Sequence, residues 1–143
     1  MCSSDLTGPG GASPTGSNNT ITETATGNNN MLITTVTGSS NALSTTINGG
    51  NNQLTTEVTT SNADITHTIT GSQNVYNVQQ TGAAGSAGHS LTTATTGSYN
   101  AITTQQQGTN DTTVNIATTG DNNTITVRSS STAIVNPMTA IAR

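Results

Sequence analysis

Large apolar side chains recur along this chain at an interval of eleven residues. The stretches GSSNALSTTIN from Gly38 and GGNNQLTTEVT from Gly49 share Gly at the first place, Asn at the fourth, Leu at the sixth, Thr at the eighth and an aliphatic residue at the tenth. Places four, six, eight and ten share one side of an alternating pattern, which is the period of a β-strand. Gly and two small polar residues at places one to three provide turn chemistry. Each unit is therefore predicted to be one short strand and one tight turn.

The pattern runs through ten units between residues 16 and 130. The first-place glycines, expected in the turns, are Gly16, Gly27, Gly38, Gly49, Gly71, Gly97, Gly108 and Gly120. The fourth-place asparagines, expected to form a hydrogen-bonded ladder, are Asn19, Asn30, Asn41, Asn52, Asn74, Asn100 and Asn123. The sixth-place residues, expected in the core, are Ile21, Leu32, Leu43, Leu54, Ile65, Tyr76, Leu91, Ile102, Val114 and Ile125. Two defects interrupt the spacing: four extra residues, 82–85, before a unit starting at Ser86, and one extra residue in the unit from Gly108.

Two units, 22 residues, are enough to carry the chain out and back beside its start. Stacked coils rise by about 4.8 Å, the spacing of paired strands, so that like residues lie over like. We therefore predict an all-β fold, a β-solenoid of about five two-strand coils. We expect Leu43 and Leu54 to face each other across the core, with Thr46 and Glu57 in water on opposite sides. An antiparallel meander is the competing fold, but it buries one face only and leaves the asparagines without a ladder.

Two stretches carry a resemblance to a known family. NVYNVQQTG from Asn74 and NAITTQQQG from Asn100 place Gln80 and Gln106 at the tenth place. The pattern Asn-x-h-x-h-x-Gln/h-x-Gly-x-x-Asn, where h is apolar, resembles the curlin repeat of bacterial curli fibre subunits. Most units depart from the family with an aliphatic residue or Thr at the tenth place and a larger residue at the sixth.

The resemblance covers residues 16–130 and implies a function. It implies a secreted subunit that self-assembles into amyloid-like fibres and supports biofilm formation and adhesion. Its partner would be itself, with a nucleator or cell-surface component as a further candidate. A curlin-like solenoid on the surface of a virion remains an alternative setting.

Composition narrows the function classes. Hydrophobic residues make up 29% of the 143 residues, aromatic residues 1% and charged residues 6%, too few large apolar groups for a conventional core. Two Arg and no Lys give a net charge of -4, which argues against nucleic-acid binding. No apolar run approaches the roughly 20 residues that span a bilayer. The acidic residues are scattered, so we expect no enzyme and no catalytic, cofactor or metal site.

Three titratable side chains fall at inward or ladder places. Glu23 is inward, and because burying an unpaired carboxylate is costly, we expect the first unit to be frayed and Glu23 to lie near water. His67 is also inward, and we expect a neutral imidazole beside stacked threonines. His89 takes an asparagine place and is expected to substitute for a ladder hydrogen bond.

Outward threonines suggest a second function. One side of the solenoid is predicted to carry Thr22, Thr24, Thr26, Thr46, Thr66, Thr68, Thr70, Thr92 and Thr96. Such an array resembles the ice-binding face of solenoid antifreeze proteins, so the alternative is a monomeric solenoid that binds ice or a polymer. A third alternative is a disordered glycosylated stalk, since Asn18, Asn110 and Asn122 open Asn-x-Thr sequons.

The two ends depart from the repeat. Residues 1–6, MCSSDL, match what a common sequencing-adapter tail encodes, and residues 7–15 are Gly/Pro/Ser-rich, typical of a linker. We therefore expect the natural chain to begin upstream, with a signal peptide lost by truncation and an extracellular or cell-surface location. Residues 131–143 break the repeat at Pro137 and are predicted to be an unstructured tail or a cap over the last coil.

Overall fold

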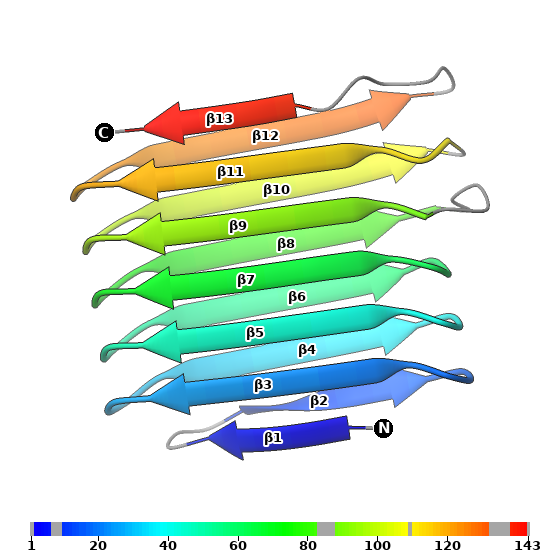
Figure 1. The fold of residues 1–143 in the computed structure, drawn as a ribbon, viewed down its shortest axis with the longest axis horizontal. Coiled ribbons are helices and arrows are strands. Elements are labelled where there is room, and N and C mark those ends of the chain that lie inside the picture. Colours follow the sequence, from blue (N-terminus) through cyan, green and yellow to red (C-terminus); the bar gives the residue numbers. More distant parts are fainter. Residues whose placement is uncertain (1, 7–9, 83–87, 109, 132–137, 143) are drawn as a thin grey trace.

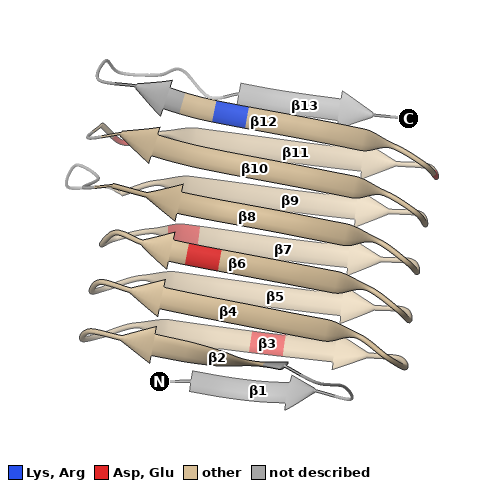
Figure 2. Ribbon diagram, turned by 180° about the vertical axis from the view of Figure 1, so that it is seen from behind, with Lys and Arg blue, Asp and Glu red and all other residues tan. Residues whose placement is uncertain are grey.

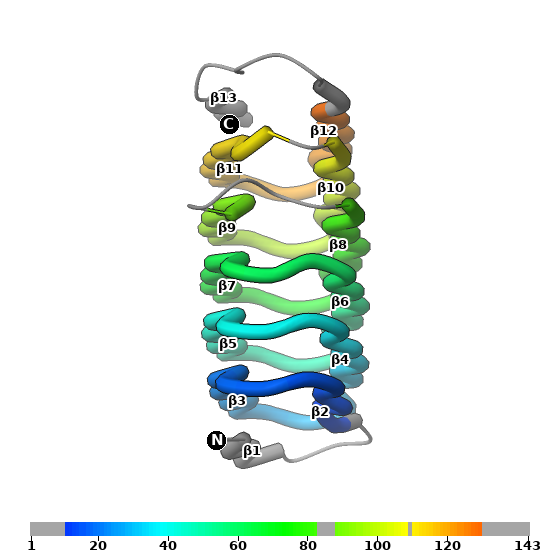
Figure 3. The backbone as a smooth tube through the Cα atoms, turned by 90° about the vertical axis from the view of Figure 1, so that its right-hand side faces the viewer, coloured from blue at the N-terminus to red at the C-terminus, as the bar shows by residue number. Residues whose placement is uncertain are grey.

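The chain winds as a β-solenoid whose two walls are parallel sheets facing each other (Figures 1 and 3). The structure is a computed structural model that describes residues 2–6, 10–82, 88–108, 110–131 and 138–142, with side chains described for 11–82, 88–108 and 110–129. The strands are β1 (Cys2–Leu6), β2 (Gly10–Thr15), β3 (Thr20–Thr26), β4 (Met31–Thr37), β5 (Ala42–Asn48), β6 (Gln53–Thr59), β7 (Asp64–Thr70), β8 (Val75–Thr81), β9 (Ser90–Thr96), β10 (Ala101–Gly108), β11 (Thr113–Thr119), β12 (Thr124–Ser131) and β13 (Met138–Ala142). Odd-numbered strands form a seven-stranded wall, and even-numbered strands form a six-stranded wall.

Strand pairing is parallel throughout and keeps like residues in register. Ile21 pairs with Leu43, and Leu43 pairs with Ile65. The predicted β-solenoid with 22-residue coils is thereby confirmed. Both the antiparallel meander and the disordered stalk are wrong, because each coil is hydrogen-bonded edge to edge with the next.

The spacing defects are absorbed at the corners. Gly82 still occupies the first place of its unit, because its N–H donates to the carbonyl oxygen of Thr59 at 3.1 Å and its φ is 120°. The next unit therefore starts at Gly82 rather than at Ser86, and the extra residues follow this glycine. The ladder is unaffected: Asn100 N–H donates to Asn74 Oδ1 at 2.9 Å across 26 residues, as Asn74 does to Asn52 across 22.

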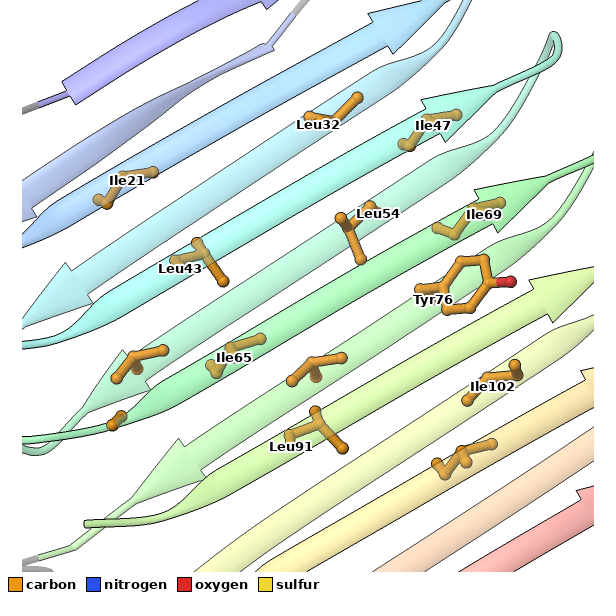
Figure 4. Close-up of a cluster of buried hydrophobic side chains, with 14 of the residues drawn as sticks. Ile21, Leu32, Leu43, Ile47, Leu54, Ile65, Ile69, Tyr76, Leu91 and Ile102 are labelled. Atoms are coloured by element: carbon orange, nitrogen blue, oxygen red, sulfur yellow. The ribbon is translucent and has the colours of Figure 1, made fainter. Parts of the chain in front are cut away.

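The core is a thin layer between the walls, and it is filled by the inward places of each strand (Figure 4). Nine of the ten sixth-place residues are buried, and Ile125 is partly buried. Aliphatic residues at the tenth place, such as Val36, Ile47 and Ile69, complete the apolar layer.

The expectation that Leu43 and Leu54 face each other is wrong. Successive strands run in opposite directions, so the sixth place of one wall lies opposite the tenth place of the other. Tyr76 at a sixth place accordingly lies beside Thr95 at a tenth place. Figure 4 likewise shows Leu54 between Ile47 and Ile69. Only eighth places face eighth places, at the middle of the core.

The segments outside residues 16–130 add strands to the walls. Residues 10–15, expected to be linker, form β2 and pair with β4, and residues 2–6 form β1 and pair with β3. At the other end, β13 pairs with β11 and extends the seven-stranded wall. The first repeat unit is therefore not the end of the stack, which changes the environment of Glu23.

The turns place glycine where no other residue fits without strain. The eight predicted turn glycines all have φ between 108° and 142°, a region that residues with a Cβ rarely adopt. At Gly49, a Cβ would also lie 1.8 Å from the carbonyl oxygen of Gly71 in the next coil. The third place adopts φ near 60°, and Asn, which tolerates this left-handed conformation, holds it in five described units. The turn is thus fixed by backbone geometry as well as by the small size of its residues.

Gly49→Ala is expected to lower the free energy of unfolding by more than about 2 kcal/mol, because it adds backbone strain and a steric overlap with the next coil. Gly11→Ala is the matched control, since a Cβ added at Gly11 would meet nothing within 4 Å and Gly11 has no positive φ. Urea unfolding followed by circular dichroism measures both. Equal stability of the two variants would contradict the close approach of neighbouring turns.

Candidate functional site

An asparagine ladder runs along one corner of the solenoid, where each residue precedes a strand of the six-stranded wall. The Nδ2 of Asn52 donates to Asn30 Oδ1 at 3.1 Å and to the carbonyl oxygen of Gly71 at 3.0 Å. Its Oδ1 accepts from the backbone N–H and the Nδ2 of Asn74, both at 3.0 Å. Asn100 Oδ1 likewise accepts from the backbone N–H and the Nδ2 of Asn123. Each amide is therefore bonded to a neighbouring coil, which joins five coils in one column.

The ladder at the opposite corner changes chemistry partway. The Nδ2 of Asn41 donates to Asn19 Oδ1 at 3.1 Å, and the Oδ1 of Asn41 accepts the backbone N–H of Ala63 at 2.9 Å. Ala63 has no side-chain amide to continue the column. His89 and Thr112 hold the next two places, and Thr112 Oγ1 lies 2.9 Å from His89 Nδ1. The structure thus brings the predicted asparagines together in two columns, one continuous through the described coils and one interrupted.

A second ladder joins the turns and was missed by the sequence analysis. The second-place hydroxyl of Ser61 accepts the N–H of Ser39 at 3.1 Å, and Ser98 Oγ accepts the N–H of Ser72 at 3.2 Å. In the later coils an aspartate takes this role, because Asp121 Oδ1 accepts the N–H of Ser98 at 2.6 Å. The signal was the recurrence of Ser at the second place. The carboxylate is a stronger acceptor than a hydroxyl, so Asp121 continues the ladder of the turns with a stronger hydrogen bond.

The middle of the core is polar. Glu23 is 1% exposed, so the expectation that it lies near water is wrong. It is buried because β1 and β2 continue the stack beyond β3. Thr34, at the facing eighth place of β4, donates a short hydrogen bond to Glu23 Oε1. This bond supplies one partner for the buried carboxylate and joins the two walls.

His67 lies in the same inward file as Glu23. Its neighbours in register are Thr45 and Thr93, so the imidazole sits between stacked threonines. The ring is 1% exposed, and burial lowers the pKa of His67 from 6.5 to about 4. The side chain is therefore neutral at pH 7, and its charged form opposes folding.

A buried polar cluster occupies the core beside the corner between β8 and β9, where the sequence has four extra residues. Gln80 Nε2 donates to Gln106 Oε1 at 2.8 Å, and Gln106 Nε2 donates to Thr112 Oγ1 at 2.9 Å. Thr112 Oγ1 in turn contacts His89. Burial lowers the pKa of His89, while a hydrogen bond to the Gly108 backbone and the charge of Asp111 act in the opposite direction. The two inward glutamines thus pair with each other across adjacent coils of the six-stranded wall. Gln106 also bonds Thr112, which precedes β11 of the other wall.

The outward face of the seven-stranded wall carries the predicted threonine array. All nine predicted threonines lie on β3, β5, β7 and β9, and each is exposed or half-buried. They are stacked in register, as in the column of Thr24, Thr46 and Thr68. In β3, β5, β7, β9 and β11 the one outward charged residue is Asp64. Across these five strands the face is therefore uncharged apart from one carboxylate near an edge.

The outward face of the six-stranded wall is more varied. It carries Glu57 on β6 and Arg128 on β12, and Figure 2 shows these strands from that side. Ile33 and Val75 are 46% and 48% exposed on the same face. Thr46 and Glu57 are exposed on opposite walls, as the sequence predicted. The two faces therefore differ in charge and in side-chain size.

Within the described part of the chain, no pocket and no group of three His, Cys, Asp or Glu side chains suited to a metal ion is found. None of the described residues belongs to a helix of the length and apolarity that a bilayer span requires. Comparisons with protein-family models, curated proteins and solved structures give no match.

Asn52→Ala is expected to lower the free energy of unfolding by about 3 kcal/mol, because it removes the four hydrogen bonds of the Asn52 side chain and leaves the part-buried Gly71 carbonyl without this donor. Asn48→Ala is the control, since Asn48 is exposed on β5 and should change stability by less than about 0.5 kcal/mol. Chemical denaturation at pH 7 measures the difference. A loss at Asn52 no larger than at Asn48 would show that the ladder contributes nothing to stability.

The pH dependence of stability should report His67. Between pH 6.5 and about 4 the unfolded chain binds a proton at this ring that the folded chain does not. The free energy of unfolding therefore falls by up to about 3 kcal/mol as the pH drops through this window. Above pH 6.5 the contribution of the neutral His67 ring to stability is fully present. His67→Thr, which matches Thr45 and Thr93 in the file, should remove this part of the slope. Parallel stability curves for the variant and the wild type from pH 7 to pH 4 would refute the assignment.

Proposed function

We propose that this protein is a structural subunit that self-assembles into an extracellular fibre by adding one solenoid to the edge of another. The observation that carries the proposal is that, among the strands the structure describes, β12 is the end strand of the six-stranded wall and pairs with β10 alone. An unpaired strand edge is a template for another chain. The proposed role is structural and not catalytic.

The direction of the backbone groups shows what the edge of β12 offers. The first N–H of each strand from β3 to β10 donates toward the C-terminal coil, as Ala101 N–H does to the carbonyl oxygen of Asn123 at 2.8 Å. Alternate residues of a parallel strand bond alternate neighbours, so the N–H groups of Thr124, Thr126 and Arg128 point away from β10. These groups match the acceptors that the next coil would supply.

A second copy would continue the coil with the same hand and register. Head-to-tail addition is a heterologous contact, which does not close on itself and yields an open filament. The ladders favour it, because Asn123 at the last described rung is bonded to Asn100 below and has the geometry to receive one more rung above. Low charge removes the repulsion that would oppose stacking.

The opposite end of the same wall is less complete as a template. Pro14 lies on β2 opposite Val36, at a place whose backbone nitrogen faces away from β4. Proline has no N–H, so the free edge of β2 lacks one donor. We infer that the joint between two copies makes one hydrogen bond fewer than the joint between two coils.

The setting of the fibre is proposed from the resemblance to the curlin repeat. That resemblance supports an extracellular or cell-surface location, with roles in biofilm formation and adhesion, and with the chain itself as the main partner. A nucleator or other cell-surface component would start the fibre, and a virion surface is the alternative setting.

A second candidate function is a monomeric solenoid that binds ice or a polymer through the threonine array. It is favoured by the stacking of Thr24, Thr46 and Thr68 in one outward column, and by the single outward charged residue, Asp64, on β3, β5, β7, β9 and β11. A soluble β-rich monomer that never forms fibres would support this candidate over the first.

Thr126→Pro is expected to slow fibre growth at least tenfold, because it removes an N–H from the free edge of β12 without touching the core. Thr126→Ser keeps that N–H and should grow like the wild type, whereas Pro14→Ser restores a donor at the other end and should grow faster. Thioflavin fluorescence and electron microscopy follow assembly, and circular dichroism confirms that each monomer is folded. Absence of wild-type fibres, or equal growth of the proline and serine variants at Thr126, would overturn edge addition.

A further inference from the structure

The outward face of the seven-stranded wall presents a regular lattice of small side chains. Its two central columns are Thr22, Ser44, Thr66, Thr92 and Asn115, and Thr24, Thr46, Thr68, Ala94 and Ala117. Because the strands pair in parallel and in register, side chains within one column are about 4.8 Å apart along the axis, and the two columns are about 7 Å apart. No described outward side chain on β3, β5, β7, β9 or β11 is aromatic, Lys or Arg. Across these five strands the face is therefore flat, evenly ridged and almost uncharged.

We propose that this face is a self-association surface on which a second copy of the chain docks, wall against wall. Two such lattices can interdigitate as sheets pack face to face at about 10 Å, with threonine methyl groups of one copy between the rows of the other. Because both partners present the same patch, the contact is isologous and two-fold symmetric. No like charges oppose it at the centre of the face, and Asp64 lies at the first residue of β7, toward one edge.

The size of the face predicts a weak contact for single molecules. Five strands at about 4.8 Å and seven residues at about 3.3 Å give roughly 24 by 23 Å, or about 550 Å² per copy. Two copies would bury about 1,100 Å², which is just above the roughly 1,000 Å² that specific contacts need and below the standard size of about 1,600 Å². The surface is thus large enough to pair two solenoids only weakly.

In a fibre the same face becomes continuous, and this part of the inference rests on the proposed function. Edge addition would extend the threonine columns from copy to copy, so that two fibres make many weak contacts at once. Linked contacts bind far more strongly than one contact alone. The face should therefore bundle fibres side by side, while the strand edges lengthen them.

The six-stranded wall is a poor candidate for the same contact and supplies the control. It mixes exposed Ile33 and Val75 with Glu57 and Arg128, so two copies of it would not present matched rows. A second copy also fits the threonine face better than a polysaccharide would, because no pocket is found in the described residues and no aromatic side chain lies on this face to stack on a sugar ring.

The test compares two double variants that add the same charge. Thr46→Lys with Thr92→Lys places two exposed lysines on the seven-stranded wall, and Thr35→Lys with Thr103→Lys places two on the six-stranded wall. Circular dichroism and urea unfolding check that both keep the fold. Sedimentation of the unassembled chain measures pairing, and electron microscopy measures the width of fibres.

We expect the wild type and the Thr35/Thr103 variant to pair weakly in solution and to form bundled fibres. The Thr46/Thr92 variant should pair at least tenfold more weakly and form single, unbundled fibres. Equal pairing and bundling in all three proteins, or equal loss in both variants, would overturn the inference. A monomeric wild type whose ice-growth inhibition is lost only in the Thr46/Thr92 variant would also overturn it, in favour of ice as the occupant. If no protein forms fibres, the proposed function fails, and the sedimentation comparison still decides whether copies pair through this face.

Discussion

The hydrogen-bonded spacing between coils is the constraint on which the rest of this structure depends. Parallel pairing sets the rise per coil at about 4.8 Å, and every other feature must repeat at that interval. Glycine is required at position 49 because a Cβ there would overlap the turn of the next coil at Gly71. Asparagine suits the fourth place because one amide can bond the coils on both sides, as Asn52 does. Side-chain choice in this protein thus follows from the axial repeat.

The same constraint explains how a chain with 29% hydrophobic residues keeps a fixed fold. A two-walled core is thin, so each strand needs few large apolar side chains, and the middle file can be polar. Thr34 and Glu23 bond across that file, and Gln80 and Gln106 bond along the axis. These hydrogen bonds give four buried polar side chains a partner inside the thin core.

The sequence was informative wherever the repeat is regular. The eleven-residue interval located the strands, the inward places and the turn glycines, because period-two alternation and positive-φ glycine are local properties. It could not decide how the walls face each other, since that depends on opposed strand directions; Leu43 and Leu54 were therefore matched wrongly. Nor could composition show that residues 10–15 would add β2, because a Gly/Pro/Ser-rich segment pairs only when a neighbouring edge is available. The burial of Glu23 was missed for the same reason.

The corners tolerate insertions that the walls do not. The extra residues after Gly82 leave the asparagine ladder intact, with Asn74 and Asn100 still bonded across 26 residues. In evolutionary terms, the gene can gain or lose whole coils by duplication or deletion of 22 codons, since each coil contacts only its neighbours. Single-codon changes in length survive only at the bends. Lineages that carry this protein should therefore differ in the number of coils and in the length of the bends, while strand length stays constant.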